Sequence, residues 1–272
     1  MRPMVCRRKE FKLSLDCQSE DFISTPQPNQ RNWVVRRAMD ELADDLSHLD
    51  RITRRFVTGS ERVEIQAEWS GSQAQYDDSQ LIIEDQQVMQ DWEHPYMKAM
   101  AEAVTRNRGD VLEIGFGMGI SASYIQEFGV DSYTVIECNE GVRERFAEWQ
   151  TRYPDRRTRL VFGPWQDRIG DLGEFDGIFF DTYASSEEEY NEYVLQDVTY
   201  AAHFFEAAAA HLRPGGIFTY YSNEIDSVSR RTQRRLFDHF GKVSFSVVRG
   251  LKPPEDCNYW WADSMVVVEA VK

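Results

Sequence analysis

Apolar and polar stretches alternate regularly from about residue 110 onward. Five short apolar runs are separated by segments of helical periodicity, at residues 110–116, 132–138, 159–163, 175–183 and 215–221. Runs of this kind are typical of parallel strands joined by crossover helices. Two further runs, at 242–250 and 264–272, have no helical segment between them. We expect these two to form an antiparallel pair at an edge of the same sheet.

The N-terminal part of the chain follows other patterns. Residues 18–32 are polar and contain two prolines, so we interpret 1–32 as a flexible lead-in. Residues 33–57 repeat apolar side chains at intervals of three and four, which predicts an amphipathic helix or a helix pair. This helix either packs on its own domain or serves as a dimerisation arm of a homodimer. The predicted organisation is then a helical extension at 33–68, a substrate lid or entry segment at 69–109 and a core at 110–272.

The composition narrows the classes of partner. The 272 residues include 46 acidic and 31 basic side chains, a formal charge of −15. This excess argues against nucleic acid, because phosphate binding requires clustered Lys and Arg. The four cysteines form no CxxC pair and no metal-ligand spacing, so we expect reduced thiols, no metal and a cytoplasmic protein. No apolar run approaches the roughly 18 residues of a membrane span, and the basic start lacks an apolar signal core, so we expect no membrane partner.

A glycine-rich motif follows the first apolar run. Residues 113–119 read EIGFGMG, with glycines at 115, 117 and 119 and an acid, Glu113, two residues before the first of them. The dinucleotide fingerprint requires its third glycine at position 120, which is Ile here. Glycines permit a sharp turn and a close approach of backbone to ligand. The pattern favours the nucleotide motif of Rossmann-like methyltransferases, whose ligand is S-adenosylmethionine (SAM).

A second acid strengthens this interpretation. Glu137 ends the next apolar run, 22 residues after Gly115, where a carboxylate can accept hydrogen bonds from both ribose hydroxyls. Trp165 follows the third run and is a candidate neighbour of the adenine, although a single Trp more often belongs to the core. Together these features predict an α/β, Rossmann-like class I methyltransferase fold. Its sheet would be mostly parallel and seven-stranded, with an antiparallel edge hairpin.

Asp181 ends the fourth apolar run, FFDTY. Ligands of such folds collect at the carboxyl ends of the strands, and a carboxylate there requires a cationic partner or several hydrogen bonds. We therefore expect Asp181 in the site. Glu187, Glu188 and Glu189 are interpreted instead as a charged helix start.

Several segments, taken together and in order over 69–272, carry a family resemblance. They are Trp69 with AQYD at 74–77, VM at 88–89, WEHPYM at 92–97, VLEIGFGMGISAS at 111–123, IECNEGV at 136–142, GPWQD at 163–167, FDGIFFDTY at 175–183, LRPGGIFTYY at 212–221 and PPEDCNYW at 253–260. With them the chain resembles guanidinoacetate N-methyltransferase and, more loosely, the related fungal arginine methyltransferases.

The resemblance implies roles for individual residues. It implies that Glu93 and Asp181 hold the guanidinium of the substrate. Further substrate contacts are expected from Trp69, Tyr76, Met97, Tyr183 and Asn223, with Trp69, Tyr76 and Asp77 on a segment that folds over the site. Cofactor contacts are expected from Tyr76, Met89, Glu113, Gly115, Gly117, Gly119, Glu137, Cys138, Gly163, Trp165 and Asp181. S-adenosylhomocysteine (SAH) would be the product.

The chemistry of a guanidinium fits two acids. Its charge is permanent, and two carboxylates can bind the planar group through parallel charge-assisted hydrogen bonds. They would orient one nitrogen towards the methyl group, and one of them would accept the proton that this nitrogen loses. We assign Asp181 as the proton acceptor and Glu93 as the orienting partner, with the reverse assignment left open.

One departure from the family bears on the substrate. The turn after the fifth run reads YYSNEID, and Glu224 would repel a short carboxylate ligand but attract an α-ammonium group; alternatively it faces solvent. We therefore expect a small cationic guanidino substrate, free L-arginine first, giving Nω-methyl-L-arginine in a specialised pathway. Methylation of guanidinoacetate or of protein arginine stays open, as does a non-catalytic SAM-binding scaffold. The glycine spacing disfavours an NAD-dependent dehydrogenase.

Overall fold

The computed structural model describes residues 69–184, 189 and 199–272. The predictions for the lead-in at 1–32, the 33–57 helix, the 33–68 extension, its role as a dimerisation arm, and Glu187 and Glu188 lie outside the described residues. Within the described ranges no helix has the length and apolar character needed to cross a bilayer. In the same ranges no group of three or more His, Cys, Asp or Glu side chains could hold a metal ion.

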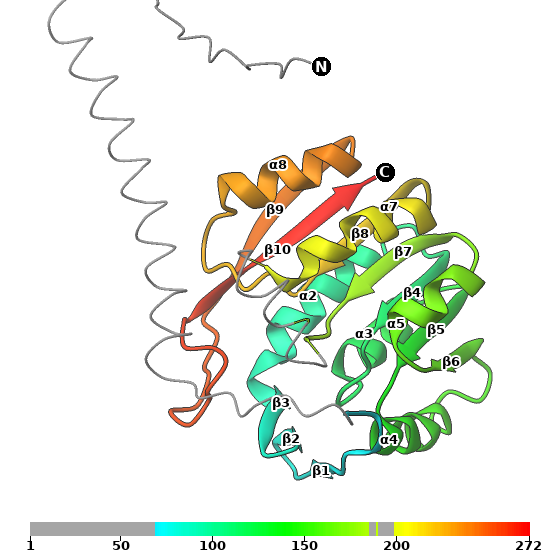
Figure 1. Ribbon diagram of the computed structural model, residues 1–272, viewed down its shortest axis with the longest axis vertical. Coiled ribbons are helices and arrows are strands. Elements are labelled where there is room, and N and C mark those ends of the chain that lie inside the picture. Colours follow the sequence, from blue (N-terminus) through cyan, green and yellow to red (C-terminus); the bar gives the residue numbers. More distant parts are fainter. Residues whose placement is uncertain (1–68, 185–188, 190–198) are drawn as a thin grey trace, which may run out of the picture. The chain divides into compact units, whose positions relative to one another are not determined.

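A seven-stranded sheet forms the centre of the molecule (Figure 1). Its strands follow the order β6-β5-β4-β7-β8-β10-β9. They are β4 (Asp110–Ile114), β5 (Ser132–Glu137), β6 (Thr158–Phe162), β7 (Phe175–Phe180), β8 (Leu212–Tyr220), β9 (Lys242–Arg249) and β10 (Ser264–Val271). The strands from β6 to β8 pair in parallel, and β10 pairs antiparallel with both β8 and β9. The predicted fold class, including the antiparallel pair at the edge, is confirmed.

Helices cover both faces of this sheet because its strands expose apolar side chains on both sides. Val111 of β4 belongs to one buried cluster, with residues of α2 (His94–Val104), α3 (Ile120–Phe128) and α4 (Glu140–Gln150). Leu112, the next residue of β4, belongs to the other. Its partners come from η3 (Ile169–Asp171), η5 (Tyr200–Phe204), α7 (Phe205–His211) and α8 (Arg230–His239). Alternate residues of β4 therefore face opposite helical layers.

Two helix starts carry the expected local signals. Pro95 lies in the first turn of α2, where its missing N–H costs nothing. Asn139 is the N-cap of α4, and its side-chain oxygen accepts a hydrogen bond from the Val142 amide at 3.1 Å. α2 packs on β7, β8 and β10 of the core sheet, and the division at 109/110 stays a prediction.

A small antiparallel sheet lies beyond the ends of the core strands, next to α4 (Figure 1). It consists of β1 (Ala74–Tyr76), β2 (Gln80–Ile83) and β3 (Gln86–Gln90), preceded by η1 (Trp69–Gly71) and followed by η2 (Asp91–Glu93). Leu81, Ile83 and Met89 of this sheet are buried in the cluster that contains α2. The segment that the sequence analysis places over the site is therefore packed on the core.

Candidate active site

The glycine-rich loop connects the end of β4 to the start of α3. Gly115, Gly117 and Gly119 have positive φ angles of 87°, 54° and 74°, a region that other residues enter only at a cost. A Cβ atom on Gly115 would lie 2.1 Å from the carbonyl oxygen of Asp181. The lack of a side chain at this position therefore allows the ends of β4 and β7 to approach each other.

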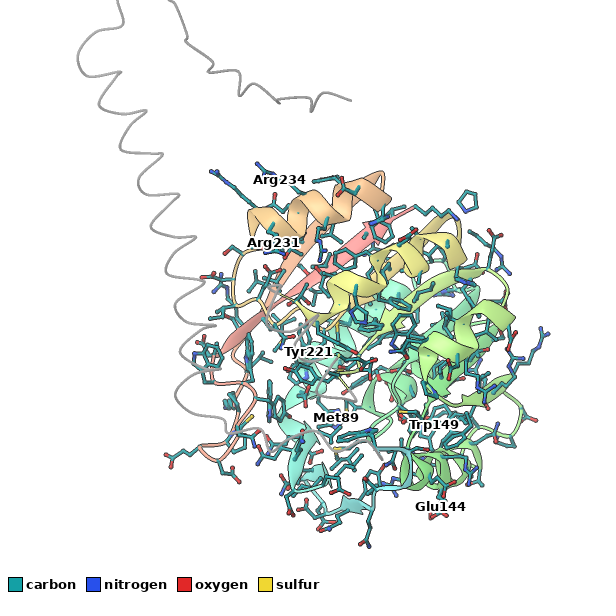
Figure 2. The ribbon with its side chains drawn as sticks, viewed as in Figure 1. Met89, Glu144, Trp149, Tyr221, Arg231 and Arg234 are labelled. Carbon is teal, nitrogen blue, oxygen red and sulfur yellow. The ribbon has the colours of Figure 1, made fainter. Side chains whose placement is uncertain are left out.

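A cavity lies beside this loop, at the carboxyl ends of the core strands. Ten of the residues that the sequence analysis assigns to the site line it: Trp69, Met89, Glu93, Gly115, Gly117, Glu137, Cys138, Asp181, Tyr183 and Asn223. Figure 2 shows Met89 of β3 and Tyr221, which follows β8, in the region between the small sheet and the core sheet. The cavity thus combines residues from several parts of the chain that are distant in sequence. We call it the site cavity.

Glu137 is the last residue of β5 and is almost completely buried. One oxygen accepts hydrogen bonds from the amides of Cys138 and Asn139, at 2.7 and 2.8 Å, and the other accepts one from Phe116 at 3.0 Å. Burial raises the pKa of this carboxyl, while the hydrogen bonds from backbone amides oppose the rise. The glycine loop and the start of α4 therefore hold the carboxylate at the wall of the cavity.

Glu113 does not line the site cavity, contrary to its predicted place in the cofactor site. It lies within β4 and is fully buried, so its side chain projects from the face of the sheet instead of from the strand end. The hydroxyls of Ser121 on α3 and Tyr133 on β5 both donate to its carboxylate. Burial raises its pKa to about 8. Glu113 thus links β4 to α3 and to β5.

Glu93 is one of two acids that face the site cavity. It ends η2 directly before α2, and only 1% of its surface is exposed. Its Oε1 atom accepts a hydrogen bond from the Gln90 amide at 2.9 Å and one from the Tyr259 hydroxyl at 2.6 Å. Burial, and next the charge of Asp181, raise the pKa of Glu93 to about 8.

Asp181 is the second acid, and it follows β7 directly. Its backbone amide donates to the carbonyl of Ile114 at 3.0 Å, which joins it to the end of β4. No described residue donates a hydrogen bond to its carboxylate. Burial raises the pKa of Asp181 to about 7. We call Glu93 and Asp181 the carboxylate pair.

Hydrogen bonds attach the small sheet, and the turn that precedes it, to the start of α4 and to the glycine-rich loop. The side-chain amide of Asn139 donates to the carbonyls of Trp69 and Ser72, at 2.8 and 2.9 Å. The Tyr76 hydroxyl donates to the carbonyl of Gly117 at 3.1 Å. Tyr76 itself is not among the residues that line the cavity, so its contact with the site is indirect. Its neighbour Asp77 accepts hydrogen bonds from Ser79 and Gln80 in an exposed turn.

Four more predicted site residues lie outside the cavity lining. Met97 is fully buried in α2 as part of the core. Trp165 packs against Phe204, with ring centroids 4.9 Å apart, instead of entering the cavity. Gly119 precedes α3, and Gly163 follows β6, where its amide donates to the Glu137 carbonyl at 2.9 Å. None of these four residues lines the site cavity.

Glu224 corrects the prediction about the substrate tail. It neither lines the site cavity nor faces solvent, because its side chain is fully buried. Its Oε1 atom accepts hydrogen bonds from the Ser229 amide at 2.8 Å and the Thr232 hydroxyl at 3.4 Å, at the start of α8. Burial raises its pKa to about 8. The preceding Asn223 has a positive φ of 56°, and at this turn Asn223 lines the cavity while Glu224 does not.

Sequence reasoning missed one group of site residues. Asn258, Tyr259 and Trp261 line the cavity and lie between β9 and β10. The resemblance included residues 253–260 but implied no role for them. Tyr259 is 166 positions from the acid that it contacts, and no local pattern reveals such a pairing.

The architecture and the strand-end cavity define a Rossmann-like class I methyltransferase fold. The model of the guanidinoacetate N-methyltransferase family matches residues 56–272, and the chain belongs to this family.

Curated relatives are fungal proteins named protein arginine N-methyltransferase 2. That of Kluyveromyces lactis is 30% identical over 169 residues, which cover 58% of this chain and 38% of the relative. That of Gibberella zeae is 26% identical over 209 residues, which cover 68% of this chain and 47% of the relative. The chain thus spans less than half of the length of these two relatives.

Among solved structures, spermidine synthase from Thermotoga maritima superposes with a TM-score of 0.51 at 15% identity. The likeness covers 73% of this chain and 72% of the synthase. At this level of identity the likeness concerns the fold alone.

Proposed function

We propose that this protein is a SAM-dependent N-methyltransferase that acts on the guanidino group of a cationic substrate. The observation that carries the proposal is the carboxylate pair: Glu93 and Asp181 line one cavity beside the glycine-rich loop. Glu93 is buried and Asp181 is partly buried, and two acids that share one cavity repel each other and are expensive to maintain. A cation with two hydrogen-bonding edges, such as a guanidinium, offsets both charges at once.

The residues around the glycine loop fit SAM as the cofactor. Gly115 and Gly117 give the backbone a side-chain-free wall, and Glu137 and Cys138 line the cavity next to it. The Glu137 carboxylate retains lone pairs beyond its backbone hydrogen bonds, which suits the acceptance of ribose hydroxyls. When bound, SAM supplies an electrophilic methyl group on a positively charged sulfur. An acid-rich cavity therefore suits the charge of the cofactor as well as that of the substrate.

The carboxylate pair would bind and orient the guanidinium. Before binding, burial raises the pKa values of Glu93 and Asp181 to about 8 and 7. A permanently charged guanidinium favours the ionised form of both acids, so its binding would displace their protons. Parallel hydrogen bonds from the planar group would then direct one nitrogen towards the cofactor.

The two acids would have different roles. Glu93 already accepts two hydrogen bonds at one oxygen, which fixes its direction and suits orientation of the substrate. No described residue donates to the Asp181 carboxylate, so both of its oxygens are available to the substrate. A pKa near the working pH suits a proton acceptor. We therefore retain Asp181 as the group that accepts the proton lost by the methylated nitrogen.

Arginine is the proposed carrier of the guanidino group. The sequence-based preference for free L-arginine depended on Glu224, and its contacts with the start of α8 remove that argument. The names of the fungal relatives support arginine within a protein. Free L-arginine and an arginine-containing peptide are therefore the first two substrates to compare, with guanidinoacetate as the third.

Mass spectrometry of products tests this proposal. The protein is incubated with methyl-deuterated SAM and, separately, L-arginine, an arginine peptide, guanidinoacetate, and L-lysine as a control cation. We expect a deuterated methyl group on a guanidino nitrogen of at least one compound and none on lysine. SAM binding without transfer to any guanidino compound would favour the scaffold, and transfer to the lysine amine would contradict the role of the carboxylate pair.

A further inference from the structure

Tyr259 contacts the carboxylate pair from a part of the chain to which no role has been assigned. It lies between β9 and β10, is 7% exposed and lines the site cavity. Its hydroxyl donates to Oε1 of Glu93 at 2.6 Å, a short hydrogen bond of the kind formed with charged acceptors. Its ring packs at a tilt on Trp92, with ring centroids 5.9 Å apart.

The segment that carries Tyr259 is tied to β3. The side-chain amide of Gln87 donates to the Asp256 carbonyl at 3.1 Å and accepts from the Asn258 amide at 2.9 Å. The base of the segment is closed by a hydrogen bond from the Leu251 amide to the Asp263 carbonyl at 2.9 Å. The hydrogen bonds to Gln87 and the hydrogen bond at the base of the segment therefore hold the Tyr259 hydroxyl against Glu93.

The hydrogen bonds of Glu93 are distributed unequally between its two oxygens. The Tyr259 hydroxyl and the Gln90 amide both donate to Oε1, and neither donates to Oε2. With Oε1 engaged, rotation of the carboxylate would break two hydrogen bonds, and the Tyr221 hydroxyl is a further hydrogen-bonding neighbour of the carboxyl group. The titratable groups that face Glu93 are Asp181 after β7, Tyr221 after β8, and Tyr259.

We propose that Tyr259 is a positioning residue, which orients Glu93 and favours its ionised form so that one carboxylate oxygen is presented to the guanidinium. The inference rests on the proposed function. A phenol that donates to a carboxylate stabilises the charged acid, which is the form that binds a cation. The hydrogen bond from Tyr259 thus lowers the pKa of Glu93, whereas burial and the charge of Asp181 raise it.

The variant Tyr259→Phe tests this proposal because it removes the hydroxyl and retains the ring that packs on Trp92. Its matched control is Tyr153→Phe, whose ring packs on Trp149 in α4, outside the site cavity. Two quantities are measured: kcat/KM as a function of pH, and the titration of the Glu93 carboxyl by carbon-13 NMR, assigned by its loss in Glu93→Gln.

For Tyr259→Phe we expect kcat/KM to fall ~10- to 100-fold at pH 7 and to recover partly at higher pH, where Glu93 ionises without its donor. The Glu93 titration should move up by about one pH unit, the equivalent of one hydrogen bond to a charged group. Tyr153→Phe should match the parent protein in both measurements. A Tyr259→Phe protein with an unchanged Glu93 titration, or with an equal loss of kcat/KM at every pH, would overturn the proposal.

A second variant covers the case in which Tyr259→Phe does not fold. Gln87→Ala releases the segment from β3 and leaves the side chains of Glu93 and Tyr259 in place. We expect it to move the Glu93 titration to higher pH, as Tyr259→Phe does. An unchanged Glu93 titration would overturn the proposal. The NMR titration needs no methyl transfer. If the parent protein methylates no guanidino compound, the proposed function fails, while the link between Tyr259 and Glu93 is still measured.

Discussion

Glu93 and Asp181 reach the same cavity by different means. Glu93 is fixed through its side chain, whose Oε1 atom accepts hydrogen bonds from Gln90 and Tyr259. Asp181 is fixed through its backbone, because its amide donates to Ile114 and its carbonyl oxygen packs against Gly115. One acid is therefore oriented before the substrate arrives, and the other has a fixed backbone and a carboxylate to which no described residue donates a hydrogen bond. This difference suggests a division into an orienting acid and a reacting acid.

Neutralising each acid in turn gives the largest expected effect. Asp181→Asn should lower kcat ~10²- to 10⁴-fold, because the proton acceptor is lost. Glu93→Gln should lower kcat and raise KM, for a loss of about 10²-fold in kcat/KM, because binding and orientation both suffer. Steady-state kinetics measure both. SAM binding, followed by calorimetry, should survive in each variant.

Glu140→Gln is a suitable control, since Glu140 lies in the exposed first turn of α4. If Glu93→Gln and Asp181→Asn lowered kcat equally and left KM unchanged, the two acids would not have different roles.

Gly115→Ala tests the backbone attachment of Asp181. The new Cβ atom would lie 2.1 Å from the Asp181 carbonyl oxygen, and the positive φ adds strain. We expect the free energy of unfolding to fall by ~3 kcal/mol or more. Gly129→Ala has a similar φ of 81° but nothing within 4 Å, so it should cost only ~1 kcal/mol. Urea denaturation of both variants measures the difference, and equal costs would show that the approach of β4 and β7 is unimportant.

The raised pKa values predict a pH dependence with a definite sign. Both acids bind protons more tightly in the folded, ligand-free protein than in the unfolded chain, so their contribution to stability is complete below the unfolded pKa values of about 4. This contribution is lost as pH rises through the folded pKa values of about 7 and 8. The Tm of the cofactor-free protein should therefore fall progressively between about pH 4 and about pH 8, and these two acids should add no further change above that range.

Glu93→Gln and Asp181→Asn should each flatten this dependence, because each amide removes one of the titrating groups. A Tm profile that is the same in both variants and in the parent protein would contradict the raised pKa values of the carboxylate pair.

Glu224→Ala gives the smallest expected effect and lies outside the carboxylate pair. The change removes the acceptor of the Ser229 amide at the start of α8. We expect a loss of about 1–3 kcal/mol in the free energy of unfolding, with KM for the guanidino substrate unchanged. Ser229→Ala, which removes the N-cap of the same helix, should cost about 1 kcal/mol. A selective rise in KM for L-arginine in Glu224→Ala would restore the sequence-based role of this residue.

The sequence predicts the features that depend on local pattern. Apolar runs and glycine spacing act over a few residues, so the seven strands, the glycine loop and the strand-end position of Asp181 could all be anticipated. Glu93 has no local signal of this strength, and its assignment came from the family resemblance. The family model confirms the resemblance, and the role of Glu93 stays a prediction.

The structure differs from the sequence-based expectation in the directions of side chains and in contacts between distant residues. Glu113 lies one residue inside the end of β4, so strand alternation turns it onto α3 instead of into the cavity. Glu224 follows Asn223, whose left-handed backbone changes the direction of the chain. Tyr259 meets Glu93 only through the tertiary fold. No pattern within either segment contains that information.

Calorimetric binding of a charged ligand and its neutral isostere tests the central claim most directly. The SAH-bound protein is titrated at pH 8 with the guanidino compound that it methylates and with the corresponding ureido compound, in two buffers of different ionisation enthalpy. The carboxylate pair predicts that only the guanidinium binds and that protons are released, with both effects lost in a Glu93→Gln/Asp181→Asn variant. Equal affinity for the two compounds, or binding without proton release, would contradict it.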